Sequence, residues 1–411
     1  MNFISNKSSQ MPPVTERSGL GLNVCSIFSG IGGIEIGLEQ AGHTTVSLCE
    51  ADTNAQTVLN KRFPNLQIHQ DILTLDSIPD CDLVSAGFPC QDLSQAGTKQ
   101  GISGNQSGLV TRLFSLLNRR KSKRPNWILI ENVPYMLKLD NSKAMHYLTG
   151  LIESVGYRWA YRVVDTRSFG LPQRRARVIL LAALDGDPRD VLLADESRQE
   201  PFHTKPSEIS EDSAYGFYWT EGKRGAGWVV EGVPPIKGGS GLGIPSPPAL
   251  WFPSRNYVCT PSIRDAERLQ GFPEGWTDVD FTGKKRSEGV RWKLVGNAVS
   301  TPVFRWVGCR LTKPESYNSS SDVRLTAARW PSAGWGQCGE KYASNASMFP
   351  IITQYQKISS FLKHPTKPLS KRATLGFLSR AKVSTEIVYS ERFFESLEAH
   401  ADNWADDQYI G

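Results

Sequence analysis

The chain has 411 residues, 39% of them hydrophobic and 21% charged, which is typical of a soluble globular protein with room for two domains. No apolar run reaches the length of a membrane span, and residues 1–20 lack the apolar centre of a secretory signal, so we expect a disordered leader on a cytoplasmic protein. The seven scattered cysteines form no C-x-x-C pair, which predicts reduced thiols and no metal. The formal charge of +6 permits an anionic partner without requiring one.

The first predicted elements are a strand, a glycine turn and a helix. Asn23–Phe28 is typical of a strand, Ser29–Gly33 of a tight turn, and the spacing of Ile34 and Leu38 of a helix that ends by Gly42. Such a turn brings backbone N–H groups close to a nucleotide-like ligand, although an ordinary tight turn would have the same pattern.

Two acidic residues follow the next strands. Glu50 comes after the predicted strand Thr44–Leu48 and 20 positions after Gly30, where a carboxylate can accept hydrogen bonds from ribose hydroxyls. A solvated carboxylate at a helix start is the alternative. Asp71 follows another short segment, residues 66–70.

Helices and strands continue to alternate along the chain. We predict helices over Ser107–Arg120 and Lys143–Val155, and strands over Trp127–Ile130, Tyr157–Asp165 and Arg177–Leu184. This alternation predicts an α/β fold with a doubly wound, mostly parallel sheet, whose ligands bind at the carboxyl ends of the strands.

Cys90 lies at such a strand end. It follows the apolar run Leu83–Ala86 within the segment Gly87–Gly97, and Pro89 fixes the backbone before it. A thiol in this place is a candidate nucleophile, whereas a free cysteine buried as a small hydrophobe is the alternative.

Two further polar clusters stand at strand ends. Glu131 and Asn132 follow one predicted strand, and Gln173–Arg177 precedes another. Each alone could be a cap or a solvated surface. Together with Cys90 they supply a nucleophile, an acid and cations on one rim of the sheet.

In this order the motifs resemble the DNA cytosine-5 methyltransferase family of prokaryotic or phage type. The resemblance covers roughly residues 22–308 and rests on eight blocks: Phe28–Gly33, Glu50, Asp71-Ile72, Gly87–Gly97, Glu131–Val133, Gln173–Arg177, Arg264–Pro273 and Leu294–Val299. The chain departs from the commonest form of the family at Leu93 and Lys293, outside the proposed chemistry.

The resemblance implies a reaction and its residues. Cys90 would add to carbon 6 of a flipped-out cytosine in double-stranded DNA, with Arg175 favouring its thiolate, Arg177 shaping the same rim and a protonated Glu131 at nitrogen 3. The methyl donor would be S-adenosylmethionine, with no metal. Its expected contacts are Phe28, Gly30, Ile31, Gly33, Glu50, Ala51, Asp71, Ile72, Pro89, Leu109 and Asn297. The expected DNA contacts are Gln91, Ser94, Asn132, Gln173 and Arg174.

The resemblance and the composition also suggest a domain organisation. We expect a catalytic domain over residues 21–184, a loop-rich recognition region over 185–255, a return segment over 256–310 and an extension over 311–411. In the extension, the basic stretch 351–382 either contacts DNA or pairs with the acidic stretch 385–411, where a helix over Glu386–Ala399 is expected.

Two alternatives stay open beside DNA methylation. Methylation of tRNA on the same scaffold is disfavoured because the Cys-Phe-Thr segment of that branch is absent. A non-catalytic DNA-binding descendant is disfavoured by the intact Cys90, Glu131 and Arg175. We expect a nucleoid-associated monomer that protects DNA, either beside a cognate restriction endonuclease or as a solitary or phage enzyme.

Overall fold

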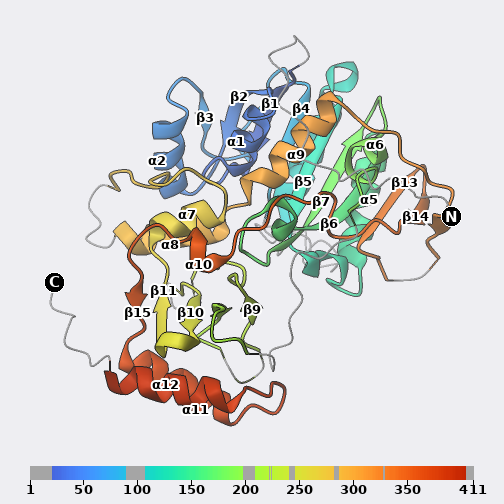
Figure 1. Ribbon diagram of the computed structural model, residues 1–411. Helices are drawn as coiled ribbons and strands as arrows, with labels where there is room; N and C mark the ends of the chain where they lie inside the picture. Colours follow the sequence, from blue (N-terminus) through green and yellow to red (C-terminus); the bar gives the residue numbers. More distant parts are fainter. Residues whose placement is uncertain are drawn as a thin grey trace. The chain divides into compact units, whose positions relative to one another are not determined.

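The computed structural model describes residues 21–88, 107–197, 209–221, 223, 225–239, 246–281, 287–326 and 329–403 (Figure 1). The chain divides into two compact units. Unit 1 comprises Met1–Phe169, Ala176–Gln199 and Val299–Thr353, and unit 2 comprises Gly170–Arg175, Glu200–Ala298 and Gln354–Gly411. Among the helices of the described segments, none is long and apolar enough to cross a membrane.

Unit 1 is built on a ten-stranded sheet of order β12-β14-β13-β6-β7-β5-β4-β1-β2-β3. The strands predicted or indicated by the sequence are β1 (Asn23–Ile27), β2 (Thr44–Cys49), β3 (Ile68–His69), β4 (Leu83–Ala86), β5 (Trp127–Asn132), β6 (Arg158–Asp165) and β7 (Ala176–Ala183). The block β3-β2-β1-β4-β5 is parallel, and β7 runs antiparallel between β5 and β6. The predicted mostly parallel sheet is confirmed.

Helices cover both faces of this sheet, as alternating strand side chains require. Val24, Leu83 and Leu129 pack with α1 (Gly33–Glu39), α6 (Pro188–Leu192) and α9 (Thr301–Thr312). Their neighbours Cys25, Val84 and Ile130 pack on the other face with α4 (Ser107–Arg119) and α5 (Lys143–Ser154). A further helix, α2 (Thr53–Arg62), follows β2 and begins at the capping residue Asp52. The sheet is therefore doubly wound.

The C-terminal extension adds strands that the sequence did not predict. Strand β13 (Ala333–Gln337) pairs antiparallel with β6, and it is followed by β14 (Glu340–Ala343) and β12 (Val323–Arg324). Part of the extension is therefore an integral edge of the main sheet.

Unit 2 has its own antiparallel sheet, of order β15-β11-β10-β8-β9. The strands are short: β8 (Tyr215–Phe217), β9 (Val229–Val230), β10 (Ala249–Phe252), β11 (Tyr257–Thr260) and β15 (Lys367–Pro368). Helices α11 (Lys371–Lys382) and α12 (Glu391–Asn403) cover one face, and α7 (Ile263–Leu269), α8 (Ser287–Asn297) and α10 (Ile358–Phe361) cover the other.

These contacts divide the chain differently from the expected domains. Residues 256–298 cluster with unit 2, whereas we expected the return segment 256–310 to complete the catalytic domain.

The C-terminal helices of the extension pack into the core of unit 2. Phe377 of α11 and Phe393 of α12 are fully buried against Phe217 and Trp251. One ion pair, Lys382 to Glu398 at 2.7 Å, joins the basic and acidic stretches. The last part of the extension thus supplies about half of the core between the unit 2 sheet and helices α11 and α12.

Candidate active site

The glycine turn after β1 has a left-handed backbone. The φ angles are 60° at Phe28, 56° at Gly30 and 86° at Gly32. Glycine adopts this conformation without strain, whereas a residue with a Cβ, such as Phe28, is disfavoured by about 1–2 kcal/mol. The half-buried Phe28 ring meets Phe88 edge-on, with 6.4 Å between the ring centroids. A strained aromatic residue thus stands at the end of β1.

Glu50, which follows β2, is hydrogen-bonded to the glycine turn. Its Oε2 accepts a hydrogen bond from the Gly30 N–H at 2.7 Å, and its Oε1 accepts one from the Asp52 N–H at 2.7 Å. Burial raises the pKa of the Glu50 carboxyl, and these two backbone donors oppose that shift. The structure brings Gly30 and Glu50 together, and each carboxylate oxygen keeps a lone pair for a ligand hydroxyl.

The other expected cofactor residues of unit 1 differ in burial and in hydrogen bonding. Asp71 accepts a hydrogen bond from the Leu73 N–H at 2.9 Å and so caps its own turn. Ile72 is buried in the core that the half-buried Leu109 of α4 also contacts. Arg112 of α4 fixes this turn by donating to the Leu75 carbonyl at 2.6 Å. Ala51 is exposed.

Glu131, at the end of β5, forms an ion pair with Arg177 on the neighbouring strand β7. The distance from Arg177 Nε to Glu131 Oε1 is 2.9 Å, and the side chains are 17% and 12% exposed. The antiparallel register pairs Asn132 with Val178, which places the two charged residues at the same rim. The expected acid and one of the expected arginines therefore lie at one rim of the sheet, where they form an ion pair that the sequence analysis did not anticipate.

The segment that leads to Cys90 begins beside this ion pair. A Cβ built on Gly87 would lie 3.8 Å from Oε2 of Glu131. Asn132 donates from its side-chain amide to the Phe88 carbonyl at 3.1 Å. Cys90 itself lies outside the described residues, as do Pro89, Gln91 and Ser94.

Two residues expected to contact DNA are instead internal. Asn132 is 3% exposed, and besides Phe88 it bonds the Val133 N–H. Gln173 is fully buried, where it donates to the Leu269 carbonyl and accepts from the Ile236 N–H. Both buried amides therefore have their hydrogen-bond partners inside the protein rather than at its surface.

The remaining predicted residues belong to unit 2. Arg175 is buried and donates to the carbonyls of Ile236 at 3.0 Å and Ala298 at 2.6 Å, so its guanidinium is hydrogen-bonded to backbone carbonyls. Arg174 and Asn297 are exposed. Gly296, beside Asn297, is needed for close packing because a Cβ there would lie 2.2 Å from the Lys237 carbonyl carbon.

Glu35, which the sequence analysis did not single out, is a buried carboxyl in the first turn of α1. The side chain is fully buried, and neither carboxyl oxygen makes a hydrogen bond of standard geometry to another described residue. Burial raises the pKa of Glu35 to about 7, while the Ser26 hydroxyl lowers it in part. The only sequence signal was a carboxyl between two isoleucines, Ile34 and Ile36.

This burial predicts a loss of stability between pH 4.5 and about pH 7. Because folding raises the pKa of Glu35 from 4.5 to about 7, the contribution of Glu35 to stability is fully present below pH 4.5 and decreases by about 3 kcal/mol as pH rises through 7. Glu35→Gln should remove this decrease, so the variant should be more stable than the wild type at pH 8. Urea unfolding across pH 4.5–8 measures the effect, with the exposed Asp76→Asn as control. Parallel stability curves for wild type and Glu35→Gln would contradict it.

Comparisons with known proteins identify the family of the chain. Residues 22–218 match the family model described as C-5 cytosine-specific DNA methylase. The chain is 54% identical to the Type II methyltransferase M2.BsuMI of Bacillus subtilis (strain 168), over 93% of this chain and 98% of that protein. It is 31% identical to the Type II methyltransferase M.NgoBI of Neisseria gonorrhoeae, over 68% of this chain and 89% of that protein.

A crystal structure shows the same fold. The Dnmt2 methyltransferase of S. pombe superimposes with a TM-score of 0.52 at 22% identity, over 71% of this chain and 98% of that one. The match to M2.BsuMI extends over nearly the whole of both chains. The chain therefore belongs to the C-5 cytosine-specific DNA methylase family and is a DNA cytosine-5 methyltransferase.

Proposed function

We propose that the chain transfers a methyl group from S-adenosylmethionine to carbon 5 of cytosine in a short specific sequence of double-stranded DNA. One observation carries the proposal. The Glu131–Arg177 ion pair lies beside Gly87, which is three positions before Cys90. Gly87 follows β4, and β4 is the neighbour of β1, whose end carries the turn in which the Gly30 N–H bonds Glu50. A nucleophile, an acid and a ligand-binding turn at one sheet edge suit covalent methyl transfer.

The glycine turn and its neighbours fit S-adenosylmethionine. Glu50 has lone pairs for the ribose hydroxyls, the half-buried Phe28 offers a ring face, and the buried Ile72 offers an apolar surface for the adenine. When bound, S-adenosylmethionine supplies an electrophilic methyl group. Asp71 would accept from the adenine amino group, with Leu109 and Ala51 beside it, while Pro89 and Asn297 remain proposed contacts.

Cys90 carries the covalent step in this proposal. Its thiolate adds to carbon 6 of the cytosine, which makes carbon 5 nucleophilic enough to take the methyl group. Glu131, protonated, donates to nitrogen 3 and stabilises the adduct, and Arg177 holds the carboxyl in place. The proton at carbon 5 then leaves to water, the bond from sulfur to carbon 6 breaks, and 5-methylcytosine is released.

The target cytosine must leave the helix to reach these groups. Flipping costs a few kcal/mol of stacking and pairing, which contacts to the DNA offset. We propose Gln91, Ser94 and Arg174 for such contacts. The relatives are named Type II methyltransferases, so we propose protection against a cognate restriction endonuclease as the biological role.

Glu50→Gln is expected to weaken S-adenosylmethionine binding by about 10- to 100-fold. The amide replaces one carboxylate oxygen by a donor that faces a backbone N–H, either of Gly30 or of Asp52, and it leaves one acceptor fewer for the ribose. Equilibrium binding of the cofactor measures the effect, and Asp76→Asn, an exposed carboxylate of the same unit, should bind normally. Unchanged affinity in a folded Glu50→Gln protein would remove Glu50 from the cofactor site.

Bisulfite sequencing of DNA from cells that express the protein tests the function as a whole. We expect protected cytosines at one recurring short motif, which would also identify the target sequence. No protected cytosine in DNA from cells that accumulate folded protein would overturn the proposal and favour a non-catalytic DNA-binding protein.

A further inference from the structure

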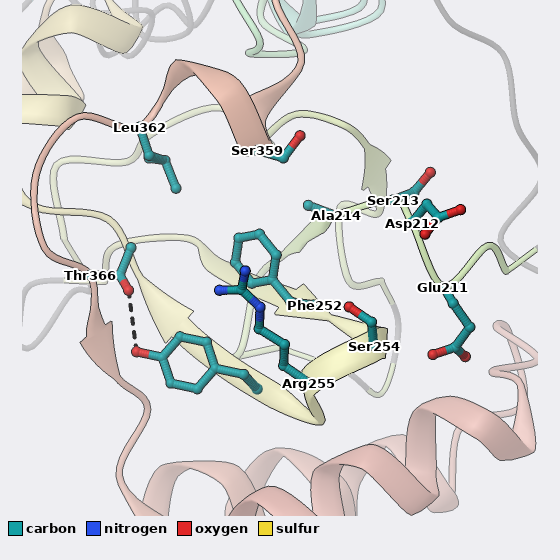
Figure 2. A pocket seen from close by; sticks show the side chains of 11 residues that line it. Glu211, Asp212, Ser213, Ala214, Phe252, Ser254, Arg255, Ser359, Leu362 and Thr366 are labelled. Atoms are coloured by element: carbon teal, nitrogen blue, oxygen red, sulfur yellow. Dashed lines mark hydrogen bonds between the residues drawn. The ribbon is translucent and has the colours of Figure 1, made fainter.

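Unit 2 contains a pocket of about 380 Å³ that the proposed reaction does not use (Figure 2). It is lined by residues 211–214 before β8, residues 252–257 around the turn between β10 and β11, and residues 359–366 of the C-terminal extension. We call it the β10–β11 pocket.

Two aromatic rings form one wall of the β10–β11 pocket. Phe252 and Tyr257 are directly opposite each other in the antiparallel pairing of β10 with β11, and their ring centroids lie 6.4 Å apart. The Tyr257 hydroxyl is 3.2 Å from the Thr366 hydroxyl, which fixes the polar edge of that ring. Both rings are half-buried, so they offer a surface on which a planar ligand can stack.

Arg255 supplies a cation to the β10–β11 pocket. It is one of the lining residues that Figure 2 labels; its side chain is exposed, and within the described part of the chain no group pairs with it. The turn that carries it is clamped, because Arg392 of α12 donates to the Pro253 carbonyl and to Asn256 Oδ1, each at 2.7 Å. A guanidinium with no partner among the described residues is free to donate to two acceptors of a ligand at once.

Asp212 supplies an acceptor on another side of the pocket. It is exposed, and no described residue bonds its carboxylate. The adjacent Glu211 is neutralised by Arg392, with 2.8 Å between Arg392 Nε and Glu211 Oε1. Two carboxylates balance two guanidiniums here, so the pocket does not favour a polyanion. It favours a planar neutral ligand with acceptors on one edge and donors on the next.

We propose that the β10–β11 pocket binds a guanine base. Arg255 donates to O6 and N7, Asp212 accepts from N1–H and the 2-amino group, and the base stacks on the Phe252–Tyr257 wall. A free guanine nucleotide and an unpaired guanine in DNA share this chemistry. Binding needs no methyl transfer, so the proposal stands or falls separately from the bisulfite result.

Calorimetric titration of the full chain with mononucleotides tests the proposal. We expect guanosine monophosphate to bind about tenfold more tightly than adenosine monophosphate, with inosine monophosphate, which lacks the 2-amino group, between them. A duplex with one unpaired guanine should displace the nucleotide if DNA is the natural source. If a free nucleotide is the natural ligand, neither this duplex nor the same duplex with every base paired should displace guanosine monophosphate.

Two variants and one control complete the test. Arg255→Ala should weaken guanosine monophosphate binding by about tenfold or more, and Asp212→Asn should abolish the preference for guanosine over inosine monophosphate. Arg372→Ala, an exposed arginine of α11 outside the pocket, should bind as the wild type does. Equal binding of guanosine and adenosine monophosphates, no saturable binding, or unchanged binding by a folded Arg255→Ala protein would overturn the proposal.

Discussion

Cys90→Ala is expected to lower methyl transfer by about 10⁴-fold or more, because the reaction then lacks its nucleophile. Carbon 5 of cytosine attacks a methyl sulfonium only after a thiolate has added to carbon 6. Alanine removes one sulfur atom, so binding of DNA and S-adenosylmethionine should change by less than about twofold. Incorporation of labelled methyl groups and binding titrations on the same preparation separate the two effects.

The six described cysteines are poor substitutes for Cys90. Burial raises the pKa of Cys49 and of Cys259 to about 12 and also raises the pKa of Cys309. The hydrogen bond to Cys81, and after it burial, raises the pKa of Cys25. A high pKa keeps a thiol protonated and unreactive. A hydrogen bond from Cys25 lowers the pKa of Cys81, but Cys81 precedes β4, at the end opposite Gly87. Cys81→Ala and the exposed Cys338→Ala are therefore matched controls that should keep full activity.

Fluorine at carbon 5 of the target cytosine tests for the covalent adduct directly. In the proposed reaction a proton leaves carbon 5 before the thiolate is eliminated, and fluorine cannot leave as a cation. The wild-type protein should therefore stay attached to fluorinated DNA under denaturing conditions, and Cys90→Ala should not. Methylation of ordinary DNA by Cys90→Ala would contradict the mechanism.

The sequence predicted the strands of the main sheet best where both of their faces are buried. The apolar runs that form β4 and β5 have few alternatives, because helices cover both sides of the sheet. The antiparallel placement of β7 between β5 and β6 was not predicted, because strand direction depends on long-range pairing rather than on local pattern.

The strands of the C-terminal extension were missed for a related reason. Strand β13 has the sequence Ala-Gly-Trp-Gly-Gln, which lacks an alternating pattern, and it is fixed by its pairing with β6. In unit 2 the strands have two to four residues, too few for a periodic signal, and helices from a distant part of the chain complete the core.

The candidate site was predictable by residue type but not by residue role. Arg175 and Arg177 share one face if the segment is extended, and the sequence cannot tell which of them meets Glu131. In the structure β7 begins between them, at Ala176, so Arg177 joins the strand and pairs with Glu131 while Arg175 bonds carbonyls of unit 2. Glu35 was hidden because its burial depends on how α1 packs on the sheet.

Glu131→Gln is expected to lower kcat by about 10²–10³-fold while leaving S-adenosylmethionine binding unchanged. Glutamine keeps the shape of the side chain, but it cannot take up and return the proton shared with nitrogen 3. The cofactor contacts assigned to Glu50 do not involve Glu131. Single-turnover kinetics on DNA of the identified sequence measure the chemical step.

A double-mutant cycle with Arg177 tests whether the two residues act as a unit. Arg177→Gln alone leaves a carboxylate that is only 12% exposed without its partner, so we expect a stability loss of about 3 kcal/mol. The variant with both substitutions should be more stable than Arg177→Gln and no less active than Glu131→Gln, because the pair is already broken. The more exposed pair Arg189–Asp187 is the control, with a coupling below about 1 kcal/mol. Additive losses of activity in the Glu131–Arg177 cycle would mean that Arg177 acts on the reaction independently of Glu131, most simply by favouring the Cys90 thiolate.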